Sequence, residues 1–430
     1  MAALGLLAPL AGAAWRQTGD DFNHEAIQYL KTTPTDPIVQ LQKRLDSGEV
    51  QLTYNAKNGY LASVLKELGI SSTTQTLVYS KTSFQRDHIS PRTPRALYFN
   101  DQTYIGWVQG GEVVEIATTD PQLGANFYIL RQASSKRPKF VRETYECLQC
   151  HSSPFTAGVP GHIVRSVYTR RDGQPELRLG THLTSDQSPF EERWGGWYVT
   201  GTHGRMRHLG NGFAQGEEEP HPPNREATAN TTSLKNLVDT SPYLTPHSDL
   251  VALMVFQHQV TLHNLIARAT YQTKIALQYE QALNKELKRP ADYRSPSTLS
   301  RVQSVCEPLV QGMLFAEVPS FPDAVAGTSG FTRQFPLQGI RDKRGRSLRD
   351  FDLITRLFRY PCSYLIYSEA FDALPPLAKD YVYRRLWEVL KGEDQSKPFA
   401  NLDALSRTAI LEVLRETKPD FATWKREKSG

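Results

Sequence analysis

Residues 248–287, SDLVALMVFQHQVTLHNLIARATYQTKIALQYEQALNKEL, decide the fold more than any other stretch of this chain. Ser248 is a residue type that begins helices and is the expected N-cap, and Asp249 then falls in the first turn, where a negative charge is favourable. The first half of the stretch is apolar on nearly every side, which is typical of a helix buried in a protein core. We therefore expect one long buried helix over residues 248–289.

The sequence changes character upstream of this helix, between residues 76 and 213. Short runs rich in aromatic and β-branched residues follow one another, separated by Asn-Asp, Gly-Gly and Asp-Pro turns, and this pattern predicts a β-rich unit. The first runs are TQTLVYS, RALYFND, TYIGWVQG, EVVEIAT and NFYILRQ, and the later ones are GHIVRSVYTR, ELRLGTHL and GGWYVTGT.

The remaining segments complete an α+β chain. Residues 15–75 form a helical N-terminal segment, because HEAIQYLKTT, DPIVQLQKRLDSGE and YLASVLKELGI carry apolar residues at helical spacing. Residues 214–247 are polar and rich in Pro and Glu, so we expect a surface loop or linker. Residues 290–430 form a mostly helical C-terminal domain after the long helix.

Composition and charge narrow the class of protein. The chain has 430 residues, of which 39% are hydrophobic and 22% charged, and this excludes a mostly disordered protein. The net charge of +5 is too weak to argue for nucleic acid as a partner.

The N-terminus predicts export. Residues 1–14 are apolar and contain Ala11-Gly12-Ala13, as in a signal peptide, although no Lys or Arg precedes the run. The run is too short to span a membrane and no later segment is expected to do so, so we predict a periplasmic or otherwise exported protein without a transmembrane anchor. The alternative is an apolar first turn packed on the domain.

The sequence Cys147-Leu148-Gln149-Cys150-His151 carries the chemistry. It resembles the C-x-x-C-H attachment sequence of c-type cytochromes. The resemblance implies that the thiols of Cys147 and Cys150 form thioethers with the vinyl groups of one haem c, and that His151 is the proximal ligand of the iron. A zinc site and a thioredoxin-type dithiol are the alternatives, but the first needs further ligand pairs and the second a βαβ setting.

The resemblance covers only the five residues of the motif. The strand-like flanks are unlike the small helical cytochromes c, and a β-rich unit with one such motif is somewhat similar to the P460-type haem proteins. The run LFRYPCSYLIYS, residues 357–368, is similar to large bacterial proteins that carry a single motif of this kind and for which no activity is implied.

The second axial position of the iron has three candidate protein ligands. His258 and His263 lie on different stripes of the long helix, and their alternative role is that of core histidines bonded to neighbouring groups. Met206 lies in GTHGRMRHLGNG, whose alternative is an exposed loop; His162 and His182 are weaker candidates in strand-like runs. In the remaining case water or substrate occupies the position.

Other residues have possible roles beside a haem. Trp194 and Trp197 either pack on the porphyrin or belong to an ordinary β-core, and Arg165 and Arg193 are candidate partners for propionates. Cys306 and Cys362 form either a disulfide or two buried thiols.

The sequence therefore predicts an exported c-type cytochrome with a single haem, which passes electrons to a partner protein that the sequence does not name. The alternatives are a haem enzyme or small-ligand sensor with an open sixth position, for example for peroxide or a nitrogen oxide, and a zinc-binding protein.

Overall fold

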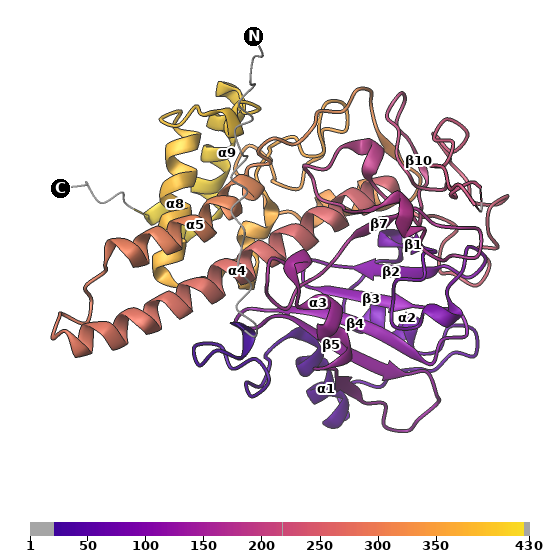
Figure 1. Cartoon of the computed structure of the whole chain (residues 1–430), viewed down its shortest axis with the longest axis horizontal. Coiled ribbons are helices and arrows are strands. Elements are labelled where there is room, and N and C mark those ends of the chain that lie inside the picture. Colours follow the sequence, from indigo (N-terminus) through magenta and orange to yellow (C-terminus); the bar gives the residue numbers. More distant parts are fainter. Residues whose placement is uncertain (1–20, 217, 425–430) are drawn as a thin grey trace, which may run out of the picture.

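The computed structural model describes residues 21–216 and 218–424, so the signal-like residues 1–14 lie outside the described part. The chain has an α+β fold in which one large sheet and a set of helices share a single long helix, α4 (Figure 1).

The centre of the β-rich unit is an antiparallel sheet of seven strands in the order β6-β5-β4-β3-β2-β1-β9. The five runs expected as its first strands are all confirmed, and β6 and β9 extend the sheet at its two edges. The strands are β1 (Thr76–Val78), β2 (Arg95–Phe99), β3 (Thr103–Trp107), β4 (Val113–Asp120), β5 (Gly124–Arg131), β6 (Phe140–Arg142) and β9 (Trp197–Tyr198). The other strands are short and form two separate pairs, β7 (Arg165–Val167) with β8 (Thr181–Leu183) and β10 (Gly201–Thr202) with β11 (Ala326–Gly327).

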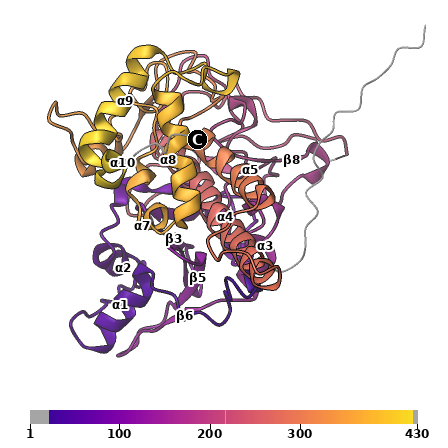
Figure 2. The same ribbon diagram turned by 90° about the vertical axis from the view of Figure 1, so that its left-hand side faces the viewer.

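Side chains alternate between the two faces of the sheet, and both faces are covered. One face, which includes Tyr98, Ile105 and Ile116, packs with the N-terminal helices α1 (Pro37–Asp46) and α2 (Leu61–Glu67). The other face, which includes Phe99 and Tyr104, packs with α4 (Leu250–Glu286). Figure 2 shows the sheet between α1 and α2 on one side and α4 on the other.

The N-terminal segment is less helical than the sequence predicts. Two of the expected helices are present as α1 and α2, whereas residues 24–33 form turns. Ile27 and Tyr29 are both buried although they are two residues apart, and Gln28 between them has a φ of 52°. The Tyr29 hydroxyl donates to the carbonyl of Ala125 in β5, so contact with the sheet overrides helical spacing here.

The long helix is confirmed, but its N-cap is Asp249 rather than Ser248. The Asp249 carboxylate accepts hydrogen bonds from the amides of Val251 and Ala252, at 2.9 and 3.0 Å. Ser248 instead ties the helix start to the sheet, because its hydroxyl accepts from the Leu77 amide and donates to the Tyr198 carbonyl.

The helix α4 has 37 residues and is about 55 Å long at 1.5 Å per residue. It meets the length and composition of a membrane-crossing helix, a match that we did not expect for any segment of the chain. However, 89% of its most apolar 18-residue window is buried within the protein, as in the core helix of a soluble domain.

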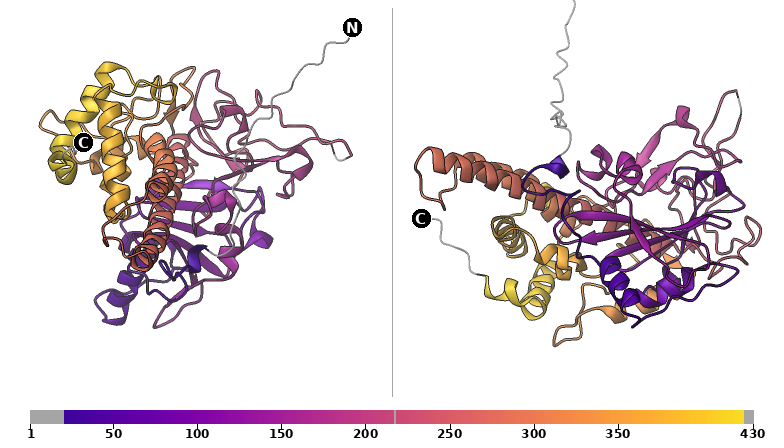
Figure 3. Two further views of the ribbon diagram at one scale, coloured as in Figure 1. Left: turned by 60° about the vertical axis from the view of Figure 1, so that its left-hand side comes forward. Right: turned by 90° about the horizontal axis from the view of Figure 1, so that it is seen from below.

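The C-terminal domain is helical, as expected. The helix α5 (Pro296–Met313) returns along α4, and α8 (Pro376–Leu390) packs on α5 (Figure 1). Figure 3 shows that α4 extends beyond the edge of the sheet, where these helices lie beside it. The other helices are α6 (Phe331–Gln334), α7 (Glu369–Asp372), α9 (Ala404–Thr417) and α10 (Pro419–Thr423). One hydrophobic cluster runs from the sheet through α4 into α5, α8 and α9, so α4 belongs to both halves.

The segment between the β-rich unit and α4 is a loop, in agreement with the sequence. Residues 214–216 and 218–247 contain no helix or strand. Leu234, Val238 and Tyr243 are nevertheless buried in the same cluster as α1 and α2, so the loop covers part of the sheet rather than linking two separate bodies.

Candidate functional site

The C-x-x-C-H motif lies on the short helix α3 (Glu146–His151), directly after the edge strand β6. Leu148 anchors this helix in a small cluster with Phe127 of β5 and Ala267 of α4. Cys147, Cys150 and His151 stand at i, i+3 and i+4 and therefore share one face of the helix. Cys147 is half-buried, Cys150 is exposed, and both are free thiols.

His151 is oriented by a backbone carbonyl. Its Nδ1 lies 2.9 Å from the oxygen of Gly161 and donates to it, and its ring packs against Phe127 with centroids 4.8 Å apart. Because Nδ1 carries the proton, Nε2 is the basic nitrogen and makes no hydrogen bond within the described chain. Burial lowers the pKa of His151 below its usual value and so favours the neutral imidazole. Histidines that bind metals often donate their other ring nitrogen to a carbonyl in the same way.

The loop that supplies Gly161 is held by α4. The Asn264 side chain donates to the carbonyl of His162 and accepts from its amide, both at 2.8 Å. A Cβ atom at residue 161 would lie 2.4 Å from the Asn264 amide oxygen, so only glycine fits there. A chain of contacts thus runs from α4 through residues 161–162 to the imidazole of His151.

Two charged residues of the sheet, Glu115 and Arg95, shift the pKa of the Cys147 thiol in opposite directions. Burial, with the charges of Glu115 and Glu143, raises the pKa of the Cys147 thiol to about 12, and Arg95 opposes this. Arg95 and Glu115 form an ion pair at 2.5 Å on the face that carries α3. The Arg95 Nε atom is buried and has no hydrogen-bond partner among the described residues.

Large apolar side chains next to the motif are exposed. Val141, Tyr145 and Phe155 are 44%, 73% and 54% accessible, although each lies within a few residues of Cys147 or His151 in the sequence. The segment that carries the two thiols therefore exposes several large apolar side chains.

His258 is a core histidine with both ring nitrogens engaged. Its Nδ1 lies 2.5 Å from the Asp186 carboxylate and its Nε2 lies 2.8 Å from the Ser363 hydroxyl. Phe315 stacks on the ring with centroids 4.3 Å apart. Neither nitrogen is free to bind iron. His258 is therefore a core histidine bonded to neighbouring groups, which was the alternative to a ligand role.

His263 keeps one nitrogen free, but it lies behind His151. Its Nδ1 contacts the hydroxyls of Tyr104 and Thr119, both at 3.0 Å, and its Nε2 is buried without a partner in the described chain. Its ring is 5.8 Å from that of His162, the residue next to Gly161. The Nδ1 of His151 bonds to this loop, and no contact joins the rings of His151 and His263 in the described chain.

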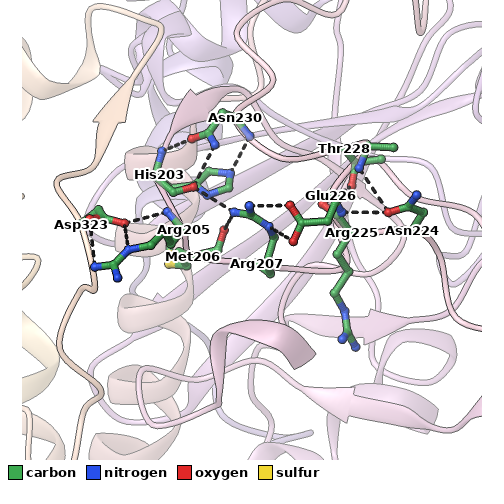
Figure 4. Close-up of polar contacts among 12 residues, drawn as sticks. His203, Arg205, Met206, Arg207, Asn224, Arg225, Glu226, Thr228, Asn230 and Asp323 are labelled. Carbon is green, nitrogen blue, oxygen red and sulfur yellow. Dashed lines mark hydrogen bonds and ion pairs between the residues drawn. The ribbon is translucent and has the colours of Figure 1, made fainter.

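Met206 is buried rather than exposed. It is 2% accessible and belongs to the cluster of Trp194 and Val199, not to that of α3. Arg205 and Arg207 on either side of it point outward to Asp323 and Glu226, as Figure 4 shows. The alternative of an exposed loop therefore does not apply to the methionine, because apolar and charged side chains alternate in this segment.

The histidines beside Met206 are also buried, and their ring centroids are 4.8 Å apart. His203 accepts a hydrogen bond at Nε2 from the Asn230 amide, so its Nδ1 carries the proton and neither nitrogen is a free metal ligand. His208 has no partner for either nitrogen in the described chain, and burial lowers its pKa to about 3.

The other residues considered beside a haem have structural roles. Trp194 and Trp197 are buried in the core, where the Trp194 indole donates to Gln257. Arg193 donates to the carbonyls of Asp186 and Ser188, and Arg165 donates to Thr181.

The two weaker histidine candidates also have partners within the protein: His162 contacts Thr119, and His182 lies 3.3 Å from Glu192. Cys306 and Cys362 are two buried free thiols rather than a disulfide.

Within residues 21–216 and 218–424, no three His, Cys, Asp or Glu side chains are grouped so that they could hold a metal ion. The two thiols and the imidazole of α3 are thus not arranged as a zinc cage. Comparison with protein-family models, with curated proteins and with solved structures gave no significant match to this chain.

Sequence reasoning found the three residues of the motif but missed Gly161, Asn264, Arg95 and Glu115. Asn264 stands 102 residues from the backbone that it binds. A glycine ten residues after the motif and an asparagine on an apolar helix carry no local signal of this contact.

Proposed function

We propose that this protein is a c-type haem protein that transfers electrons. Cys147 and Cys150 attach one haem c, and His151 is the proximal ligand. The hydrogen bond from His151 Nδ1 to the Gly161 carbonyl carries the proposal, because it leaves Nε2 free on the helix face that also holds both thiols. Covalent haem attachment takes place outside the cytoplasm, so the proposal includes export, with residues 1–14 as the signal.

The surroundings of α3 fit this cofactor in two respects. A haem is a large apolar plate with two carboxylates at one edge. The exposed Val141, Tyr145 and Phe155 supply apolar surface next to the motif. The half-buried Arg95, which pairs with Glu115 through Nη2, has an unpartnered Nε donor and acts electrostatically on both Cys147 and His151, as a propionate partner would need to do.

The haem would supply a one-electron iron couple. Cys147, Cys150 and His151 would hold it, while Gly161 and Phe127 fix the imidazole plane and the Gly161 carbonyl keeps Nδ1 protonated. Hydrogen bonding at Nδ1 makes the imidazole a stronger donor, which favours the ferric state.

The second candidate function is binding of a small ligand at an open sixth position. The observation in its favour is that both nitrogens of His258 are engaged and that Met206 belongs to a different cluster from α3. A haem without a second protein ligand binds small molecules such as carbon monoxide.

The test is production of the full chain in a host that matures c-type cytochromes, followed by denaturation and an absorption spectrum. We expect a covalent haem band that is lost in Cys147→Ser with Cys150→Ser. The matched control is Cys306→Ala, which should keep the haem because this thiol is buried in the helical core.

Carbon monoxide separates the two functions. A reduced spectrum that is unchanged by carbon monoxide supports electron transfer, and one that shifts supports the open site. Absence of any covalent haem, together with one equivalent of bound zinc, would overturn the proposal in favour of a zinc protein.

A further inference from the structure

A cavity of about 280 Å³ lies between the β-rich unit and the C-terminal domain. Its walls come from residues 186–193, the first turns of α4 around Met254 and Gln257, the loops that contain residues 315–321 and 355–361, and Asn401. Cavities at the junction of two structural units are frequent ligand sites.

This cavity is separate from the proposed haem site. Gln257 lines it, whereas Asn264 holds the loop against which His151 is oriented. These positions are about 10 Å apart along α4 at 1.5 Å per residue, so the inference is independent of the haem.

The wall is largely aromatic. Phe190 and Phe321 pack in a tilted arrangement with centroids 5.9 Å apart, and Phe315 and Phe358 pack edge to face at 5.5 Å. An apolar cavity of about 150 Å³ holds benzene. The volume here is nearly twice as large, which fits a molecule of one or two fused rings.

The charged residues of the lining favour an anion. Arg193 is 2% accessible, donates through Nε and Nη2 to backbone carbonyls, and uses Nη1 in no hydrogen bond of the described chain. Burial lowers the pKa of Arg193 to about 10, so the guanidinium stays charged at neutral pH. Arg356 is the second cation in the lining, and its charge also acts on the carboxylate of Asp403.

The single carboxylate of the lining is already satisfied. Asp186 binds His258 at 2.5 Å and lies 3.4 Å from the Gln257 amide, so both of its oxygens are directed to α4. The lining itself therefore holds two guanidinium groups and one carboxylate beside an aromatic wall, with Glu191 near Arg193 and Asp403 near Arg356 outside it.

We propose that this cavity binds a small aromatic carboxylate, with the rings among Phe190, Phe321 and Phe358 and the carboxylate at Arg356 and Arg193. The aromatic faces supply apolar contact and the guanidinium groups supply charge-assisted hydrogen bonds.

Isothermal titration calorimetry of the full-length protein with 2-naphthoate tests the proposal, with the neutral 2-naphthamide as a ligand of matched shape. We expect 2-naphthoate to bind to a single site and more tightly than 2-naphthamide. Arg356→Ala should weaken 2-naphthoate about fivefold or more and leave 2-naphthamide within about twofold. The matched control is Arg359→Ala, because Arg359 is exposed three residues away and does not line the cavity.

A second variant tests the location. Val318→Trp fills the cavity from a half-buried loop position and should abolish binding of both ligands. No heat of binding for 2-naphthoate up to millimolar concentration would overturn the proposal. Equal affinity for the two ligands, or binding that survives Val318→Trp in a folded protein, would do so as well.

Discussion

Replacing Asn264 by leucine tests the contact between α4 and the loop that orients His151. The amide side chain makes two hydrogen bonds of 2.8 Å to the backbone of His162. Leucine has a similar volume but no polar atom, so the His162 amide and carbonyl lose their partners in a site where Asn264 is 8% accessible.

The expected loss follows from these two groups. A buried backbone group left without a partner costs about 1–3 kcal/mol, and the extra apolar surface of leucine returns about 1 kcal/mol. We therefore expect the free energy of unfolding to fall by about 1–5 kcal/mol, a large part of the 5–15 kcal/mol that is usual for a folded domain.

Urea unfolding followed by far-UV circular dichroism measures this change. The control is Thr261→Ala on the same helix, which removes only a bond to the carbonyl of Gln257 one turn earlier and should alter stability by less than about 0.5 kcal/mol. In the haem-loaded protein, the leucine variant should also have a raised midpoint potential, because the acceptor for His151 Nδ1 is less fixed. A stability loss below about 1 kcal/mol would refute the reasoning, since it would mean that the loop does not depend on α4.

Four further outcomes follow from the structure. Asp249→Ala removes the cap of α4 and should lower the free energy of unfolding by about 1–2 kcal/mol in the same urea assay. Ser363→Ala leaves the buried Nε2 of His258 unpaired and should cost about 1–3 kcal/mol, whereas equal stability would mean that a water molecule replaces the hydroxyl. Hydrogen bonds from Arg178 and Arg170 lower the pKa of Glu176 from 4.5 to about 2. The ionised Glu176 therefore stabilises the folded state fully above pH 4.5, and this stabilisation is lost as the pH falls toward 2. The melting temperature of the wild type should therefore fall more steeply over this range than that of Glu176→Gln. Thiol titration of the denatured haem-loaded protein should find two reactive groups, Cys306 and Cys362, and four would mean that no thioether has formed.

The sequence was sufficient where local pattern and burial agree. The five central strands and α4 have spacings that only one kind of element satisfies, and all of them are present. Prediction from the sequence failed where contacts between residues far apart in the chain determine the local structure. Residues 24–33 have helical spacing, yet Tyr29 bonds to Ala125 and the segment forms turns. Ser248 and Asp249 are both residue types that cap helices. The hydroxyl of Ser248 bonds to the Leu77 amide in the sheet, so Asp249 is the N-cap.

The candidate site was likewise predictable from the sequence only in part. The motif is contiguous and was visible at once. The direction of its imidazole depends on Gly161 and Asn264, which local patterns do not connect with it. For the second ligand, sequence reasoning selected histidines by their apolar surroundings, but such surroundings also describe His258, whose partners come from residues 72 and 105 positions away.

The position of α4 late in the chain has a consequence for biosynthesis. One face of the sheet, with Leu97, Phe99 and Tyr104, is covered mainly by a helix that ends at Glu286. At 5–20 residues per second, about 8–30 s pass between synthesis of the last residue of β5 and that of the end of α4. During this interval the nascent chain exposes an apolar sheet surface, so a chain truncated before residue 248 should aggregate or stay bound to a chaperone, even though it contains the complete motif.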